Sequence, residues 1–311
     1  LTIDGGNIKS SDFLGSGSAG DISLSANGKF SLFNTGAIIS ANLNSQNNAG
    51  NITVLSRGDI LLQGIDTNDG MSIISSSTRT QGNAGNIIIT SGGNLSMDNR
   101  ASISSSTSGA GSAGDISIVT KGDVNLLNKG VIFNSSFNFG SIANGNAGNI
   151  VINSASNILV GKDSSIDSGT AANSLSNGGT VKLTAAGELN VKGGLISVGT
   201  QGFGAAGNIE LQASKLNADH GIITSGSKGE TSSGKNGNIF INADQELSLV
   251  NSSFISSFND AIVTASELQA ITPGNINFSA LNIHLNNSSI FTDAGGNTSA
   301  GNINLNFSHG L

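Results

Sequence analysis

The chain has 311 residues, and 44 Gly, 50 Ser and 41 Asn stand against one Pro and no Cys, Trp or Tyr. This composition disfavours an ordinary helix-rich enzyme, and the absence of Cys leaves no disulfide framework and no thiolate metal site. A net charge of -7 without any basic run disfavours a surface that neutralises nucleic-acid phosphates or binds an anionic membrane.

A four-residue motif recurs along the chain: Ala, then Gly, then Asn or Asp, then Ile. Nine intervals of 27 to 37 residues separate the ten anchor glycines, and self-similarity at this period is typical of a solenoid. We therefore predict one domain over residues 1–311, as a segment of a longer repeat protein. The anchors are Gly20, Gly50, Gly85, Gly114, Gly148, Gly179, Gly207, Gly237, Gly274 and Gly301.

Each repeat unit predicts three short strands. Apolar residues lie two and four places after the anchor, a second pair follows after a turn, and a third run places an apolar residue before a small polar one, as in Ile103-Ser104-Ser105. This period of two is that of a strand. In chain order the first pairs are Ile22/Leu24, Ile52/Val54, Ile87/Ile89, Ile116/Ile118, Ile150/Ile152, Val181/Leu183, Ile209/Leu211, Ile239/Ile241, Ile276/Phe278 and Ile303/Leu305.

These strands predict an all-β fold, a single-stranded right-handed parallel β-helix of about ten coils of roughly 31 residues, with three strands in each coil. Coils stacked about 4.8 Å apart would form a rod on the order of 50 Å long. Length variation is expected only between the third strand and the next anchor. The longest insertion spans 258–273; its segment 260–272 is the only one with helical character, and Pro273 ends it.

The residue after the anchor glycine is Asn or Asp in nine of the ten units. We expect these side chains to stack as a ladder in which amides bond between coils. We attribute the anchor glycine itself to a positive φ or a tight corner. The ladder residues are Asp21, Asn51, Asn86, Asp115, Asn149, Asn208, Asn238, Asn275 and Asn302.

The units resemble the repeat region of the filamentous haemagglutinin family, the large bacterial exoproteins of two-partner secretion. The resemblance rests on runs such as GNAGNIII at 82–89, GDVNL at 122–126 and ISSS at 103–106, and it covers nearly the whole chain. It implies export through an outer-membrane β-barrel transporter partner, folding outside the cell, and a role in adhesion or biofilm contact. Autotransporter passengers share this β-helix, and the family's amino-terminal secretion domain is not evident.

Polysaccharide lyases and glycosidases also use parallel β-helices, but their chemistry needs two close carboxylates or an acidic calcium site with a base nearby. Asp163 and Asp167 share one coil, yet the matching positions of the neighbouring coils hold no acid. His220, His284 and His309 lie far apart in the repeat and form no zinc triad. We expect no catalytic residue, no cofactor and no metal.

Recognition, if the segment has any, is expected in the loops after the third strands. Phe137, Phe139, Phe203 and Phe258 are predicted to lie in such loops, where an aromatic ring could stack on a sugar or cover a corner of the barrel. Arg57-Gly58-Asp59 spells a tripeptide known from integrin ligands. Because Gly58 stands in the slot where other repeats also start a turn with Gly, we interpret it as a structural turn.

The sequence therefore predicts a non-enzymatic, secreted or surface-exposed bacterial adhesin segment. It would act as a stiff stalk and as a scaffold for binding glycans or a cell surface, without nucleic-acid binding or membrane insertion. The alternatives are a carbohydrate-active β-helix enzyme and a segment of a phage tail fibre.

Overall fold

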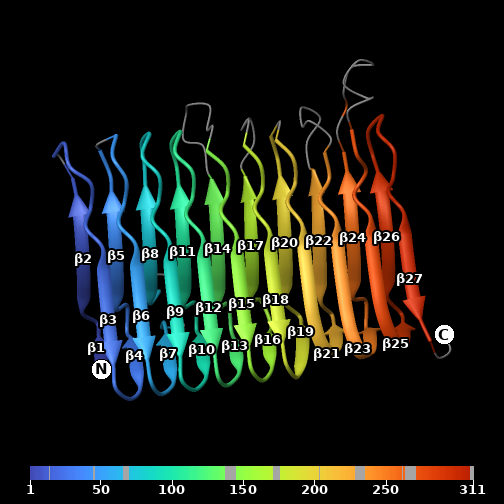
Figure 1. The fold of residues 1–311 in the computed structure, drawn as a ribbon, viewed down its shortest axis with the longest axis horizontal. Coiled ribbons are helices and arrows are strands. Elements are labelled where there is room, and N and C mark those ends of the chain that lie inside the picture. The colour runs from blue at the N-terminus through green and yellow to red at the C-terminus, as the bar shows by residue number, and fades with distance from the viewer. Residues whose placement is uncertain are drawn as a thin grey trace.

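The structure is a computed structural model, and it describes residues 1–13, 15–44, 46–65, 70–136, 145–170, 176–202, 204–227, 235–260, 262 and 271–308. The chain forms a parallel β-solenoid of about nine turns, which confirms the predicted fold class. Figure 1 shows the coils side by side, in chain order from one end of the long axis to the other. The described residues contain no helix.

Six consecutive coils have the three predicted strands. Each third strand is six residues long, twice the length of the run that the sequence singled out. The first strands are β3 (Ile22–Ala26), β6 (Ile52–Ser56), β9 (Ile87–Ser91), β12 (Ile116–Thr120), β15 (Ile150–Ser154) and β18 (Val181–Ala185). The second strands are β4 (Phe30–Phe33), β7 (Ile60–Gln63), β10 (Leu95–Asp98), β13 (Val124–Leu126), β16 (Ile158–Val160) and β19 (Glu188–Lys192). The third strands are β5 (Ala37–Asn42), β8 (Ile73–Thr78), β11 (Ser102–Thr107), β14 (Val131–Ser136), β17 (Ser165–Thr170) and β20 (Leu195–Thr200).

The remaining coils differ from the prediction because their first and second strands join. Each joined strand is 11 or 12 residues long, and the pairing shifts register between Ala213 and Lys215 of the first one. No glycine stands at this junction, so the chain passes it as a bulge rather than a turn. The joined strands are β21 (Ile209–Asp219), β23 (Ile239–Val250) and β25 (Ile276–Asn286), followed by the third strands β22 (Ile222–Ser227), β24 (Phe254–Asn259) and β26 (Ser289–Ala294). The ends of the chain contribute β1 (Thr2–Asp4), β2 (Asn7–Asp12) and β27 (Ile303–Phe307).

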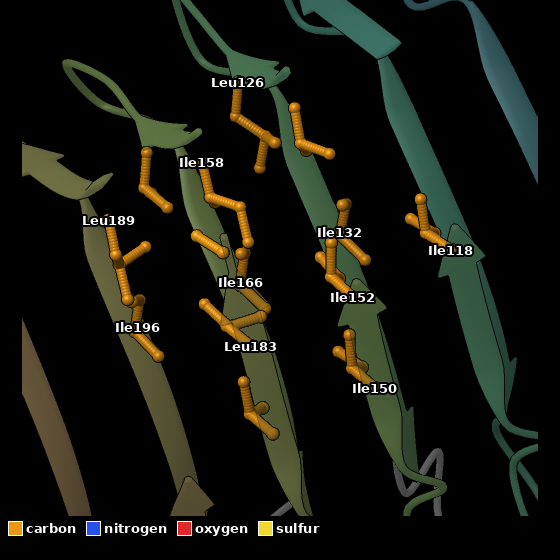
Figure 2. Close-up of a cluster of buried hydrophobic side chains, with 14 of the residues drawn as sticks. Ile118, Leu126, Ile132, Ile150, Ile152, Ile158, Ile166, Leu183, Leu189 and Ile196 are labelled. Carbon is orange, nitrogen blue, oxygen red and sulfur yellow. The ribbon is translucent and has the colours of Figure 1, made fainter. Parts of the chain in front are cut away.

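Neighbouring coils pair strand on strand in parallel register, so each column of the core repeats one type of side chain. Ile116 of β12 lies opposite Ile87 on one side and Ile150 on the other, and all three are fully buried. Figure 2 shows part of this core, where Ile132, Ile166 and Ile196 follow one another through three coils. Each such side chain contributes about 1.5 to 3 kcal/mol by burial, and the buried apolar side chains of the described coils belong to one cluster.

The anchor glycines are explained by close stacking of the backbones. No described anchor has a positive φ, so the first of the two expected explanations was wrong. Instead, a Cβ added to Gly114 would lie 2.4 Å from the carbonyl oxygen of Gly85, the anchor one coil earlier. The backbones of consecutive anchors therefore meet where only glycine fits.

A column of small polar side chains inside the solenoid, which we call the inner serine column, joins the third strand to these anchors. The Ser105 hydroxyl donates to the Gly85 carbonyl at 2.9 Å and accepts from the Gly114 N–H at 2.9 Å. Asn134 makes the same two contacts with its amide in the next coil. Ser40, Ser76, Ser168, Ser225 and Ser257 also donate to an anchor carbonyl, whereas Val198 takes this place in β20.

Four of the described turns between second and third strands contain two consecutive residues in the left-handed region. Asn99 and Arg100 have φ of 49° and 64°, and Asn128 and Lys129 have 46° and 69°. Two consecutive positive φ angles define a tight type I′ turn, for which Asn is well suited. Between β7 and β8 this turn is replaced by nine residues, 64–72. Length variation is therefore not confined to the stretch before the anchor, as the sequence had suggested.

Candidate binding grooves and polar ladders

The Asn and Asp residues after the anchors form one column, but the bonds between them differ from those expected. Where the preceding coil has Asn or Asp in this column, the backbone N–H of the next residue donates to its Oδ1, as from Asn51 to Asp21 at 2.7 Å and from Asn302 to Asn275 at 2.8 Å. A side-chain amide adds a second bond where the acceptor is Asp21 or Asp115. The same backbone bond recurs at Asn86, Asp115, Asn149, Asn238 and Asn275, with Asn208 as the acceptor for Asn238.

A second ladder runs through the turns between first and second strands, in the column nine places after the anchor, and its hydrogen bonds were not predicted from the sequence. The N–H of Asn94 donates to Asp59 Oδ1 at 2.8 Å, and the column continues through Asp123, Asn157 and Glu188. Hydrogen bonds from Ser156 and Asn157 lower the pKa of Asp123. The acid of Arg57-Gly58-Asp59 thus binds the neighbouring coil, which supports the structural interpretation of that tripeptide.

The candidate acids and histidines that the structure describes lie in different turns and strands. Asp163 lies in a turn with a φ of 57°, whereas Asp167 lies on β17. His220 Nδ1 is 2.8 Å from Asp219 Oδ1, and His284 is exposed on β25. In the part of the chain that the structure describes, no group of three or more His, Asp or Glu residues could hold a metal ion. His309 lies outside the described residues.

Of the four phenylalanines predicted to lie in ligand-contacting loops, only Phe258 falls in the described part of the chain; Phe137, Phe139 and Phe203 lie outside it. Phe258 is not in a loop but in strand β24, because the third strand extends further than the sequence pattern indicated. Most of the insertion 258–273 likewise lies outside the described residues, and its first two residues belong to β24.

Phe258 borders a groove on the outer face of the ten-stranded sheet, which we call the glycine groove. Gly169, Gly199 and Gly226 lie opposite one another on three neighbouring strands, and Phe258 follows them on β24. A Cβ added to Gly226 would lie 2.6 Å from the Phe258 ring, so the ring covers this glycine. The cavity of about 300 Å³ extends from there toward Asp167 on β17.

Of the described residues that line the glycine groove, Asp167 is the one that carries a charge. Burial raises the pKa of its carboxyl, and a hydrogen bond from the Ser197 hydroxyl partly offsets that effect. Its partners in the neighbouring strands are Phe133 and Ser197, neither of which is charged. The groove therefore combines an aromatic ring, an unneutralised carboxylate and hydroxyl groups in one concave surface.

The raised pKa predicts how the stability of an Asp167→Asn variant depends on pH. Between 3.8 and the raised value the folded state binds more protons than the unfolded state, so stability falls as pH rises through this window. We expect the Asn variant to be more stable than the unsubstituted chain at neutral pH. The gain in stability should vanish below pH 3.8, where the protonated Asp167 side chain and the Asn side chain are both neutral. Urea unfolding at neutral pH and below pH 3.8 measures the difference in stability between the variant and the unsubstituted chain.

Asp123→Asn is the matched control, with the opposite sign. Because the folded-state pKa of Asp123 is lowered, its contribution is present above 3.8 and is lost as pH falls through the folded value. This variant should be less stable at neutral pH, and the loss should shrink in acid. A gain in stability for both variants at neutral pH would contradict the assignment of the two shifts.

A second groove, the amide groove, lies on the outer face of the other sheet, over β18, β21, β23, β25 and β27, with a volume of about 690 Å³. Phe240 is 42% exposed there. Lys182 Nζ and Glu210 Oε2 form an ion pair of 3.1 Å, and Asn304 donates to Asn277 at 2.8 Å. Phe240 was not predicted as a contact residue. It follows the first apolar residue of a first strand, and in this repeat a residue at that position faces outward.

No protein-family model, no curated protein and no solved structure matches the chain. Within the described residues, no helix is long and apolar enough to cross a membrane. The functional assignment therefore rests on the repeat, the polar columns and the two grooves.

Proposed function

We propose that the chain is a scaffold segment of a secreted or surface-exposed bacterial adhesin, where it acts as a stiff stalk without catalytic activity. The observation on which this rests is the unbroken parallel pairing of the coils from β1 to β27. Each coil is bonded to the next through backbone ladders, the Asn and Asp columns and the inner serine column. Such a structure resists bending because any bend must break several of these bonds at once.

The resemblance of the repeat units to filamentous haemagglutinins supports an extracellular location and an outer-membrane β-barrel transporter as the secretion partner. A chain without cysteine has no disulfide to form or break during such a passage. Polysaccharide or a neighbouring cell surface is the expected contact. The position of several acids in structural ladders favours a scaffold over a carbohydrate-active enzyme.

Single-molecule pulling between the two ends of the chain tests the stalk. We expect little extension at low force, followed by a series of abrupt steps as coils detach one after another. Each step should release roughly 100 Å, the contour length of about 31 extended residues. Gradual extension at low force, without steps, would contradict a load-bearing role.

Catalysis is tested separately by incubating the chain with a panel of bacterial and host polysaccharides. Release of new reducing ends or of unsaturated uronate would contradict the proposal and direct attention to Asp163 and Asp167. Retention of a polysaccharide without turnover agrees with an adhesin.

A further inference from the structure

We propose that the glycine groove binds a neutral oligosaccharide that lies across strands β14 to β24. One sugar ring packs against Phe258, and hydroxyl groups of other sugars in the chain bond to Asp167 and the neighbouring polar side chains. This inference goes beyond the scaffold role, which would hold even if the groove bound nothing.

The shape of the groove suits an extended chain. The three glycines leave the outer face of β17, β20 and β22 without side chains in this column. From β14 to β24 the groove crosses four strand spacings, or about 19 Å at roughly 4.8 Å each. An occupant of this length and small width is a short polymer rather than a compact cofactor.

The strands pack closely around all three glycines. A Cβ on Gly226 would collide with Phe258, a Cβ on Gly199 would lie 3.1 Å from the Gly226 carbonyl oxygen, and one on Gly169 would lie 3.2 Å from the Gly199 carbonyl oxygen. At the latter two positions a side chain would require the neighbouring strand to shift by a few tenths of an ångström. Close strand packing therefore favours glycine in this column, and an open groove is the result.

Phe258 supplies an apolar wall at one end of this floor. Its ring is half-buried and packs over Gly226, where a Cβ would leave no room for it. An aromatic ring among polar groups is typical of small-ligand sites, in which an apolar surface gives affinity and a few polar groups give orientation. The C–H face of a sugar ring can pack on such a surface while its hydroxyl groups remain free to hydrogen-bond.

The charge of the groove selects among sugar chains. Asp167 is an acceptor for hydroxyl groups, and Ser197, Gln201 and Thr224 add donors and acceptors nearby. Among the described residues, no Lys, Arg or His lines the groove. A uronate or a sulfate would therefore meet a carboxylate with no cation to balance it, in a partly buried place where repulsion is stronger than in water. The ligand class is accordingly neutral.

Isothermal titration of the whole chain with neutral and anionic oligosaccharides tests this proposal. The neutral probes are hexasaccharides of β-1,4-glucose, α-1,4-glucose, N-acetylglucosamine and β-1,4-galactose; the anionic probes are hexagalacturonate and a sulfated heparin hexasaccharide. We expect at least one neutral probe to bind and neither anionic probe to do so. Phe258→Ala should weaken binding about tenfold or more, because the apolar wall is lost.

Gly199→Val is the decisive variant. Its side chain fills the floor of the groove, and a β-branched residue is favourable in a strand. Because the added Cβ would lie 3.1 Å from the Gly226 carbonyl oxygen, circular dichroism first establishes that the variant is folded. The folded variant should have lost binding. Phe240→Ala is the matched control, because it removes an exposed ring from the amide groove on the other sheet and should change the affinity by less than about twofold.

Three results would each overturn the proposal. They are the absence of binding for all neutral probes, a preference for an anionic probe, and unchanged binding by folded Gly199→Val. Loss of binding in Phe240→Ala alone would place the site in the amide groove instead. None of these results alters the pulling experiment, so failure of the groove and failure of the stalk can be told apart.

Discussion

Replacing Gly114 by Ala is expected to lower the free energy of unfolding by about 3 to 5 kcal/mol, which is large for a single added methyl group. The new Cβ would lie 2.4 Å from the Gly85 carbonyl oxygen and 2.6 Å from its carbon. Neither backbone can move away easily, because each is also bonded to the coil beyond it. Relief of the contact must therefore separate coils or distort the inner serine column.

Gly28→Ala is the control, since a Cβ at Gly28 has no atom within 4 Å. That variant should be unchanged or more stable by about 0.4 to 1 kcal/mol, through the lower entropy of its unfolded chain. Urea unfolding followed by circular dichroism measures both variants. Equal effects at the two glycines would show that close stacking is not what the anchors provide.

Ser105→Ala is expected to destabilise the fold by about 2 to 4 kcal/mol, because two buried backbone groups lose their partner together. These are the Gly85 carbonyl and the Gly114 N–H, each 2.9 Å from the hydroxyl. A cavity the size of one oxygen atom cannot admit water to replace both bonds. Hydrogen exchange at the Gly114 amide should speed up in parallel with the loss of stability.

Ser106→Ala provides the comparison on the next residue of the same strand. Ser106 is half-buried on the outer face of β11, so its hydroxyl is not part of the inner column. We expect a change within about 0.5 kcal/mol for this variant. If both variants lost stability equally, the effect would come from serine in the strand and not from the bonds to the anchors.

The core and the coil length could be predicted because both depend on short-range periodicity. The alternation around Ile87 and Ile89 places one side of a strand inward, and regular recurrence of the anchor glycine sets the stacking unit. Both features are visible without any knowledge of which residues meet across coils. The serine of the third strand was also visible as a pattern, although its two bonds to the anchors were not.

The grooves could not be predicted in the same way, because they depend on register between coils. Gly169, Gly199 and Gly226 are ordinary glycines in the sequence, and they become a floor only when three strands are aligned at the same step. Phe258 was assigned to a loop because the third strand was taken to end too early. The joined strands were missed for a related reason. The second apolar pair of this coil begins one residue early, at Leu216, and this shift is explained by a bulge in a continuous strand rather than by a turn.

The connections before the anchors vary in length without changing the rise of the solenoid per coil. Eight residues join β26 to β27 and sixteen join β24 to β25, yet each coil advances the rod by the same strand spacing of about 4.8 Å. Sequence inserted at this edge therefore adds surface without changing reach. Removal of a whole coil, by contrast, shortens the reach by one fixed step and leaves every other contact in register.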